Sequence, residues 1–522
     1  MTQKIVIGVD IGTTSTKAIA IDVKGRVLAH HAVDYPLLRP EPAAAEQDPQ
    51  QIFEAVTTVI QSCAAQCRAK QADTQVLAVS FSAAMHSLIA IDGDDQPLTH
   101  SITWADNRAA PWAERIGAEW DGLAIYRRTG TPIHPMSPLA KLVWLRHEKP
   151  ELFARTRRFV GIKEFVFHRL FGQWVVDHSI ASATGLFNLE RLDWDEGALA
   201  LAGIEADQLA TPRPTTDSLR GLPASLAESL GLPADTPFVL GANDGVLSNL
   251  GVNAIQRGEV AVTIGTSGAM RCVVDRPLTD AEGRTFCYAL TQDHWVVGGP
   301  VNNGGIILRW VRDEFAAAET ETAKRLGIDP YEVLTRIAER VSPGAEGLLF
   351  HPFLAGERAP YWDARLRGSF FGLGMHHGKE HMIRAALEGV IFNLYSILPA
   401  VEAVAGTSRA IKATGGFARS AMWRQMMADV FNRDVIVPES FESSCLGAAV
   451  LALYALGHVE SLDVVADMVG ATHRHSPDPE SAALYDQLKP VFLSLPHKLQ
   501  DEYRTLAAFQ QRVGSRALNS SQ

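Results

Sequence analysis

Two short segments, about half a chain apart, have the residue types of phosphate-binding turns. The first runs from Ile5 to Asp22 and turns at Gly12-Thr13-Thr14-Ser15, and the second runs from Val260 to Arg271 and turns at Gly265-Thr266-Ser267-Gly268. Apolar residues with strand character flank both turns, which predicts two β-hairpins. Glycine lets the backbone approach a ligand closely, and successive N–H groups with small hydroxyls form a concavity for anions. Such hairpins are common singly, but two copies with one Ile-Gly-Thr core favour phosphate binding over coincidence.

The two copies differ at the residue before Ile-Gly-Thr, which is Asp10 in the first and Thr263 in the second. Carboxylates are the protein ligands that Mg²⁺ takes most often. We therefore expect the first hairpin to help hold a metal ion through Asp10, and the second to offer neutral donors only. Two related but unequal hairpins predict two related domains that grip one nucleotide between them.

A candidate general base follows an apolar run in the first half. Pro237-Phe238-Val239-Leu240 reads as a buried strand, and Asp244 follows it between Gly241 and Gly245. Ligand clefts of α/β proteins open at the carboxyl ends of strands. A carboxylate at that position can accept the proton of a hydroxyl that attacks a γ-phosphoryl group. The alternative is that Asp244 caps the following helix, but glycines on both sides favour close approach by a ligand.

The pentapeptide Trp104-Ala105-Asp106-Asn107-Arg108 has the composition of a sugar site. It combines an aromatic ring, a carboxylate, an amide and a guanidinium directly after the strand-like Ile102-Thr103. Sugar pockets combine an aromatic wall with convergent hydrogen-bonding groups. Arg108 is the first candidate to bind a substrate carboxylate, because a guanidinium can do so with two parallel hydrogen bonds. The alternative is a charged helix start that Asp106 caps.

Three further residues are weaker candidates. The segment Ser82–Ser87 ends another predicted strand, and His86 within it either hydrogen-bonds a polyol or lies in the core with its hydrogen bonds satisfied. Lys163 and His134 are reserve candidates for a substrate carboxylate.

Glycine-rich turns in the second half predict an adenosine pocket. The segment Lys412–Ser420 runs strand, Gly415-Gly416, helix, and Gly298–Gly305 precedes an apolar helix that carries Arg309. Glycines here allow a flat ligand or phosphates to lie near a helix N-terminus. A single Gly-Gly pair is weak evidence, so the prediction depends on its place in the second half.

The elements that must position these residues alternate between strands and helices, which indicates an α/β fold. In the first half we expect a strand meander over 4–33, a helix opened by Asp48-Pro49, and strands at 76–81 and 88–91. The pattern restarts near Glu259, with a helix at 379–398, a strand at 410–414 and a helix after Ser420. Residues 462–522 read as a charged helical extension. We place the domains at 1–252 and 253–522.

Length and composition narrow the class of protein. A chain of 522 residues exceeds the size of one hydrophobic core, and a net charge of −11 argues against non-specific nucleic-acid binding. No apolar run approaches the roughly 20 residues of a membrane helix, and no signal-peptide pattern opens the chain. Five scattered cysteines fit thiols in a reducing cytoplasm. We expect a cytoplasmic protein with no nucleic-acid or membrane partner. The sequence does not fix the oligomeric state, and a homodimer is one option.

The segments described so far resemble the FGGY family of carbohydrate kinases, in the actin-like ATPase superfamily, over most of the chain. Met136–Leu145 is similar to the first family signature, and the region from Gly356 to Gly372 is similar to the second. Within the family the chain resembles the gluconokinase branch, on segments 81–87, 103–108, 130–136 and 244–253. Ser87 stands where xylulokinase-like members often have glycine, and this difference argues against a pentulose such as xylulose as the substrate.

The resemblance implies two ribonuclease-H-like domains flanking a catalytic cleft that binds ATP, Mg²⁺ and a sugar. Asp244 is then the catalytic base, and Asp10 the acid that holds Mg²⁺ through bound water. The remaining implied site residues are Thr13, Thr14, Lys17 and Thr266 at the phosphates; Gly305, Arg309, Gly416 and Ser420 around the nucleotide; and Met85, His86, Trp104, Asp106, Arg108 and Met136 around the sugar.

The function that this implies is ATP-dependent phosphorylation of D-gluconate at its terminal hydroxyl, giving 6-phospho-D-gluconate. An alternative within the class is a xylulokinase-like kinase for another sugar or polyol. An alternative from another class is an actin-like ATPase that works as a chaperone or filament. Such an ATPase needs phosphate-binding hairpins but no sugar pocket. The segment Trp104–Arg108, which has the composition of a sugar pocket, therefore argues against it.

Overall fold

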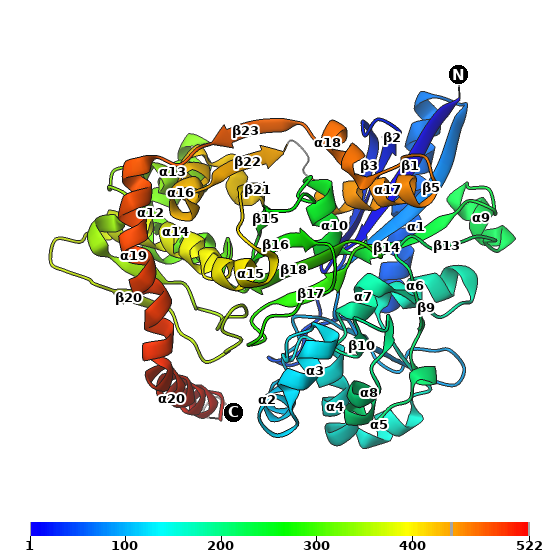
Figure 1. Cartoon of the computed structure of the whole chain (residues 1–522), viewed down its shortest axis with the longest axis horizontal. Helices are drawn as coiled ribbons and strands as arrows, with labels where there is room; N and C mark the ends of the chain where they lie inside the picture. Colours follow the sequence, from blue (N-terminus) through cyan, green and yellow to red (C-terminus); the bar gives the residue numbers. More distant parts are fainter. Residues whose placement is uncertain (1, 439–441, 520–522) are drawn as a thin grey trace. The chain divides into compact units, whose positions relative to one another are not determined.

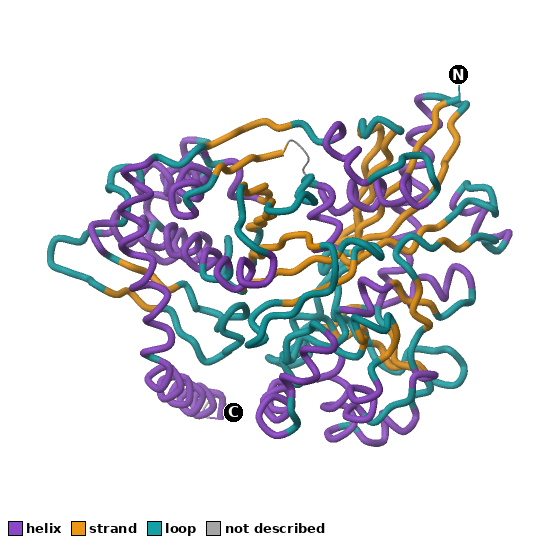
Figure 2. Tube along the Cα trace, in the orientation of Figure 1, coloured by secondary structure: helices purple, strands orange, loops and turns teal. Residues whose placement is uncertain are grey.

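The computed structural model describes residues 2–438 and 442–519 and divides by internal contacts into two units. Unit 1 comprises Met1–Arg257, Cys272–Val297 and Glu439–Gly470, and unit 2 comprises Gly258–Arg271, Gly298–Pro438 and Ala471–Gln522. Both mix strands and helices (Figures 1 and 2). The predicted division at Val252 stays a prediction.

A six-stranded sheet carries the first hairpin in unit 1. Its order is β13-β14-β5-β1-β2-β3, with bounds β1 Gln3–Ile11, β2 Ser15–Asp22, β3 Val27–Asp34, β5 Thr74–Ala83, β13 Ser218–Leu219 and β14 Phe238–Asn243. Strands β1, β2 and β3 form the predicted antiparallel meander, while β5 runs parallel to both β1 and β14. In register, Asp10 lies beside Ser82, and Ala83 beside Asn243. The carboxyl ends of three parallel strands therefore bring Asp10 and the residue before Asp244 to one edge of the sheet.

Helices pack directly against the six-stranded sheet. The predicted helix after Asp48 is α1 (Pro49–Lys70), and the Asp48 carboxylate accepts hydrogen bonds from the amides of Gln50 and Gln51. Helix α10 (Asp244–Gly251) packs on α17 (Ser443–Ala455), which also contacts β1 and β5. A Cβ at Gly447 would lie 2.1 Å from the carbonyl oxygen of Leu247. Only glycine at position 447 lets the backbones of α10 and α17 approach so closely. This contact holds α10, the helix that begins at Asp244, in place.

Short elements of unit 1 hold the predicted sugar-binding segments. Strand β4 (Glu46–Gln47) pairs antiparallel with β7 (Ser101–Ile102), directly before Thr103 and Trp104. Strand β6 (Ile89–Ile91) pairs with β8 (Arg158–Val160). The helices that follow are α2 (Ala110–Glu119), α3 (Gly122–Thr129), α4 (Pro138–Glu148), α6 (Ile162–Phe171) and α7 (His178–Ser182).

A second sheet has seven strands in the order β17-β18-β16-β15-β21-β22-β23. Its strands are β15 Glu259–Ile264, β16 Gly268–Val274, β17 Phe286–Ala289, β18 Trp295–Val301, β21 Ala410–Gly415, β22 Asp434–Pro438 and β23 Ala471–His475. The helices α11 (Ile306–Trp310), α13 (Pro330–Ala338), α14 (Lys379–Tyr395), α15 (Leu398–Ala405), α16 (Ala421–Phe431), α19 (Pro479–Lys498) and α20 (Gln500–Asn519) belong to unit 2. Most predicted elements of the second half are thus confirmed.

One prediction for the C-terminal segment is wrong in part. Residues 462–522 are not wholly helical, because β23 pairs antiparallel with β22 at the edge of the second sheet. The sequence of β23 is Ala-Thr-His-Arg-His, which lacks the alternation of apolar and polar residues that marks a strand. Its pairing with β22 therefore decides its structure.

Within residues 2–438 and 442–519, one helical stretch, Lys379–Ala405, is long and apolar enough by length and composition to cross a membrane. Its apolar window is 72% buried inside the structure, as in the core helix of a globular protein, and a single stretch of this kind is weak evidence for a membrane span. Charged residues interrupt it at Arg384 and Glu388, which pair with each other at 2.7 Å.

Candidate active site

Two carboxylates meet at the edge of the first sheet. Ser82 Oγ donates a hydrogen bond to Asp10 Oδ1 at 2.6 Å. Burial, followed by the nearby carboxylate of Asp244, raises the pKa of Asp10 to about 6, although the Ser82 hydrogen bond opposes this. Two neighbouring acids without a cation between them repel each other, which disfavours the ionised form. The pair therefore has the character of a site for a cation or for proton transfer.

The fit to Mg²⁺ depends on this pair. Among the described residues no group of three or more His, Cys, Asp or Glu side chains is arranged to hold a metal ion. Mg²⁺ does not need such a group, because it keeps several waters and binds proteins through one or two carboxylates together with substrate phosphates. Asp10 fits that requirement by itself, with the Asp244 carboxylate nearby.

Asp244 does not cap the helix that it begins. The cap is Asn243, whose Oδ1 accepts a hydrogen bond from the amide of Val246 at 2.9 Å. Asp244 Oδ1 accepts from the amide of the next residue, Gly245, at 2.6 Å. The capping alternative for Asp244 is therefore not what the structure shows.

Lys163 supports the strand end before Asp244. Its buried ammonium pairs with Asp177 at 2.8 Å and donates to the carbonyl oxygen of Ala242 at 3.1 Å. These partners make Lys163 part of the scaffold under the carboxylate pair, rather than a group directed at a substrate.

The first phosphate hairpin is held from its carbonyl side. Gly12 and Ser15 close the turn through a backbone hydrogen bond of 2.9 Å. The Tyr35 hydroxyl donates to Gly12 O at 2.8 Å, and Gln47 Nε2 donates to Thr13 O at 2.7 Å. Carbonyl oxygens repel phosphate. Because the carbonyl oxygens of Gly12 and Thr13 already accept hydrogen bonds from Tyr35 and Gln47, the turn can still bind an anion.

Lys17 of the same hairpin has a partner that the sequence did not reveal. Its Nζ lies 3.2 Å from Glu442 Oε1, and the two residues are 425 positions apart in the sequence. Both side chains are about one-third exposed, so the ion pair is open to competition by a phosphate. No local pattern around Glu442 marks it as a site residue.

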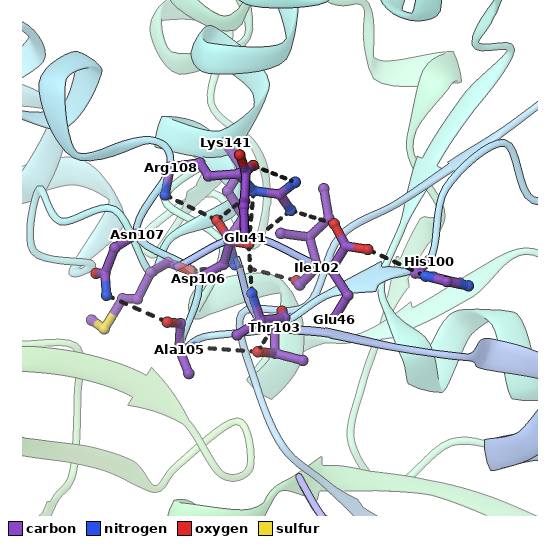
Figure 3. Close-up of polar contacts among 12 residues, drawn as sticks. Glu41, Glu46, His100, Ile102, Thr103, Ala105, Asp106, Asn107, Arg108 and Lys141 are labelled. Carbon is purple, nitrogen blue, oxygen red and sulfur yellow. Dashed lines mark hydrogen bonds and ion pairs between the residues drawn. The ribbon is translucent and has the colours of Figure 1, made fainter. Parts of the chain in front are cut away.

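The predicted sugar cluster is a charge network (Figure 3). The fully buried Asp106 accepts from the amides of Ala45 and Arg108, at 3.0 Å in both cases. Arg108 Nη2 lies 2.7 Å from Asp106 Oδ2 and 2.5 Å from Glu46 Oε1. The guanidinium also stacks 4.7 Å from the centre of the Trp144 ring. Two carboxylates thus already bind one edge of Arg108, and its Nη1 faces the exposed Glu41 at 3.6 Å.

Lys141 connects three segments that contain predicted sugar-binding residues. Its fully buried Nζ donates to the carbonyl oxygens of His86 at 2.5 Å, Met136 at 2.8 Å and Ile102 at 3.4 Å. Burial lowers the pKa of Lys141 to about 7, with Asp106 opposing and Arg108 assisting the shift. Lys141 lies inside the first signature segment, but its role as a common anchor is visible only in the structure.

The other predicted sugar-binding residues surround this anchor. His86 is buried at a left-handed backbone position, φ 70°, and its Nδ1 lies 2.7 Å from Ala183 O. Met136 is 1% exposed, and its amide donates to His134 Nδ1 at 3.2 Å. Met85 is partly buried against the hydrophobic core of unit 1. The structure thus brings these residues into one neighbourhood.

Unit 2 contains a cavity of about 670 Å³ at the predicted adenosine pocket. Its lining includes Gly305, Gly416 and Ser420, all predicted to border the nucleotide, together with Tyr331 and Trp423. The volume is that of a pocket for a drug-sized or cofactor-sized ligand. Ser420 also caps α16 by accepting from the amide of Trp423 at 3.3 Å. Arg309 lies on α11 but is not among the residues that line this cavity.

The second hairpin joins the start of α11. The amides of Gly305 and Ile306 donate to Gly265 O at 2.7 Å and Thr266 O at 3.1 Å. As in the first hairpin, donors engage the carbonyl oxygens of the turn.

Residues 5–251 match the N-terminal domain of the FGGY family of carbohydrate kinases, and residues 260–456 match its C-terminal domain. The chain belongs to the FGGY family of carbohydrate kinases. It is 58% identical over 511 residues to a gluconokinase of Bacillus licheniformis, covering 98% of this chain and 99% of the relative.

Two solved structures share the fold. A gluconate kinase from Lactobacillus acidophilus superimposes with a TM-score of 0.90 at 38% identity, covering 97% of this chain and all of that one. A ligand-bound xylulose kinase from the same organism gives a TM-score of 0.89 at 38% identity, covering 96% of this chain and all of that one. The predicted α/β class, with two actin-like ATPase-type domains, is therefore confirmed, as is the class of carbohydrate kinase. ATP is the phosphoryl donor that this family uses.

The roles of individual site residues stay predictions. The structure brings Asp10 and Asp244 close together. Lys141 donates hydrogen bonds to the carbonyl oxygens of both His86 and Met136. Three of the predicted nucleotide-binding residues line one cavity. Sequence reasoning missed Glu442, Gln47 and Lys141, because each has at least one partner that lies far away in the chain.

Proposed function

We propose that this FGGY kinase transfers the γ-phosphoryl group of ATP to the terminal hydroxyl of D-gluconate, giving 6-phospho-D-gluconate. The observation that carries the proposal is 58% identity to a gluconokinase over nearly the full length of both chains. The aromatic ring, carboxylate and guanidinium in the segment from Trp104 to Arg108 support a polyol substrate with a charged end.

Asp244 is the proposed general base. It removes the proton from the attacking hydroxyl while the oxygen bonds to the γ-phosphorus, and ADP leaves. Its place at the start of α10, with the capping work done by Asn243, supports this role. General-base assistance of this kind contributes roughly 10²–10⁴-fold to a rate.

Asp10 is the proposed Mg²⁺ ligand, acting through bound water. Its raised pKa reflects burial and the neighbouring Asp244 carboxylate, a situation that a divalent cation reverses. When bound, Mg²⁺ neutralises charge that develops on the phosphates. Ser82 holds the Asp10 carboxylate in a fixed orientation through its 2.6 Å hydrogen bond.

The proposed nucleotide contacts divide into those of the phosphates and those of the nucleoside. Thr13, Thr14, Lys17 and Thr266 are the proposed phosphate contacts. Gly305, Gly416 and Ser420, which line the 670 Å³ cavity, are the proposed nucleoside contacts. Arg309 is retained as a candidate on α11, one turn beyond Gly305.

Arg108 remains the first candidate for the gluconate carboxylate. Its Nε and Nη2 are held by Asp106 and Glu46, which fixes the plane of the guanidinium, while the ion pair at Nη1 spans 3.6 Å. Met85, His86, Trp104 and Met136 are the proposed contacts of the polyol chain.

A substrate panel tests the proposal. ADP release is measured with D-gluconate, D-xylulose, a neutral hexitol and no sugar, and the product is identified by ³¹P NMR. We expect the highest kcat/KM with gluconate and little ADP release without sugar. The structural likeness to a xylulose kinase at 38% identity makes xylulose the second candidate, and a higher kcat/KM for xylulose overturns the assignment.

We further propose a cytoplasmic enzyme whose partners are the sugar acid and ATP. All five cysteines are free and buried, which suits a reducing compartment. Light scattering during size-exclusion chromatography decides between a monomer and the homodimer.

A further inference from the structure

A side-chain hydrogen bond joins the sugar cluster to the phosphate hairpin. Trp104 Nε1 donates to Thr13 Oγ1 at 2.9 Å, and the two residues are 91 positions apart in the sequence. Trp104 is half-buried and opens the segment assigned to the sugar, whereas Thr13 lies in the turn assigned to phosphate. The roles assigned separately to these two residues are therefore physically connected within unit 1.

Strand β4 makes the same connection in parallel. The side chain of Glu46 pairs with Arg108, and the side chain of the next residue, Gln47, donates to Thr13 O. Neighbouring residues of a strand point to opposite faces, so β4 contacts the sugar cluster on one side and the hairpin on the other. Gln47 is 4% exposed, which keeps this contact away from water.

The direction of the Trp104 bond determines what Thr13 can do next. An indole N–H only donates, so Thr13 Oγ1 must be the acceptor. A hydroxyl has one proton, and accepting at a lone pair leaves that proton available for a further acceptor. Accepting one hydrogen bond also strengthens the one that the same hydroxyl donates. A phosphate oxygen is an acceptor of the required kind.

We infer that Trp104 is a positioning residue for phosphoryl transfer, whose indole N–H orients the Thr13 hydroxyl toward a phosphate oxygen of the nucleotide. The inference rests on the proposed function and adds to it, because Trp104 then acts on the phosphates as well as forming the wall of the sugar site. Its effect on the phosphates passes entirely through Thr13.

A double-mutant cycle tests this dependence. Trp104→Phe keeps an aromatic face and removes the N–H, while Thr13→Val keeps the branched shape and removes the hydroxyl. We expect each single variant to lower kcat/KM for ATP by about three- to tenfold, at saturating sugar. The double variant should be no worse than Thr13→Val alone, because the N–H has nothing left to orient.

Two further variants serve as controls for this cycle. Thr14→Val removes the neighbouring hydroxyl of the same turn. The indole of Trp104 has one N–H, which it donates to Thr13 Oγ1, so the loss from Thr14→Val should multiply with that from Trp104→Phe. Thr13→Ser keeps the hydroxyl and should stay within about twofold of the unaltered enzyme. A Thr13→Ser variant as impaired as Thr13→Val overturns the inference, even if Trp104→Phe fails to fold.

The opposite outcome is equally definite. If Trp104 serves only as a sugar wall, Trp104→Phe raises KM for the sugar, leaves KM for ATP unchanged, and its loss multiplies with that of Thr13→Val. The same cycle is measured as affinity for a non-hydrolysable Mg²⁺-ATP analogue without any sugar. That readout tests the inference even if gluconate proves not to be the substrate, so the two proposals fail separately.

Discussion

Replacing Lys141 by methionine tests whether this residue stabilises unit 1 or mainly holds the predicted sugar-binding segments in position. Methionine matches the length of lysine and removes the amino group that anchors His86 O, Met136 O and Ile102 O. Ile102 O also accepts from the amide of Leu88 at 3.0 Å, so it keeps a donor. The carbonyls of His86 and Met136 lose the Lys141 donor, at about 1–3 kcal/mol each.

A second effect opposes this loss. The pKa of Lys141 falls from 10.5 to about 7 through burial, and each pKa unit corresponds to about 1.4 kcal/mol, so the buried charge costs about 5 kcal/mol. Methionine removes that cost. The two effects are of similar size, and we expect the free energy of unfolding at pH 7 to change by less than about 2 kcal/mol.

The effect on activity should be larger than the effect on stability. Three segments lose their common anchor, and misplacement of a substrate by about 1 Å lowers rates roughly 10²-fold. We expect kcat/KM for gluconate to fall between about tenfold and a hundredfold, mainly through KM, with KM for ATP little changed. Denaturant unfolding and steady-state kinetics on the same preparations measure both quantities.

The pH dependence gives an independent check. As the pH rises above about 7, Lys141 loses its proton in the folded protein, whereas in the unfolded chain it stays charged until about pH 10.5. The unfolded state therefore binds more protons in this range, and stability rises with pH. Lys141→Met removes that rise. The stability of the unaltered protein relative to the variant should therefore increase by about 2 kcal/mol from pH 7 to pH 9.

Lys163→Met is the contrasting variant. Lys163 is also buried, but it pairs with Asp177, so its removal leaves an uncompensated buried carboxylate and should destabilise by about 3–5 kcal/mol. Equal destabilisation by both variants, or an unchanged KM for gluconate in Lys141→Met, refutes the reasoning about Lys141.

Asp244→Asn should lower turnover by at least about 10²-fold while a calorimetric titration still detects ATP binding; near-normal turnover excludes Asp244 as the base. Asp10→Asn should raise the Mg²⁺ concentration needed for half-maximal rate, whereas Thr263→Val should leave it unchanged, and equal responses contradict the asymmetry of the two hairpins. Arg108→Ala should lower kcat/KM roughly tenfold to a hundredfold more for gluconate than for a neutral polyol of equal length. Equal losses for both substrates mean that Arg108 serves only its pairs with Asp106 and Glu46.

Features encoded within a few neighbouring residues could be predicted from the sequence. Both hairpins, the helix that Asp48 caps, and the strand that ends before Asp244 follow from turn residues and apolar periodicity, which act over one element. The likeness of the two Ile-Gly-Thr segments was sufficient to propose paired phosphate sites. Family membership followed from the same local motifs.

Partnerships between distant residues were decided by the tertiary structure. The pair Lys17–Glu442 spans 425 positions and depends on where α17 packs. The Trp104–Thr13 bond depends on the pairing of β4 with β7. Strand β23 exists because β22 offers it an edge.

Arg108 shows the physical reason most directly. Its residue type and spacing predict a carboxylate partner, but they do not specify whose carboxylate it binds. Folding places Asp106 and Glu46 within 2.7 Å of its guanidinium, and an ion buried this far from water requires compensation by the chain itself. The sequence by itself thus determined which chemical groups this protein has at its site. Which of these groups pair with one another depends on strand register and on the burial of charge, and both exist only in the folded chain.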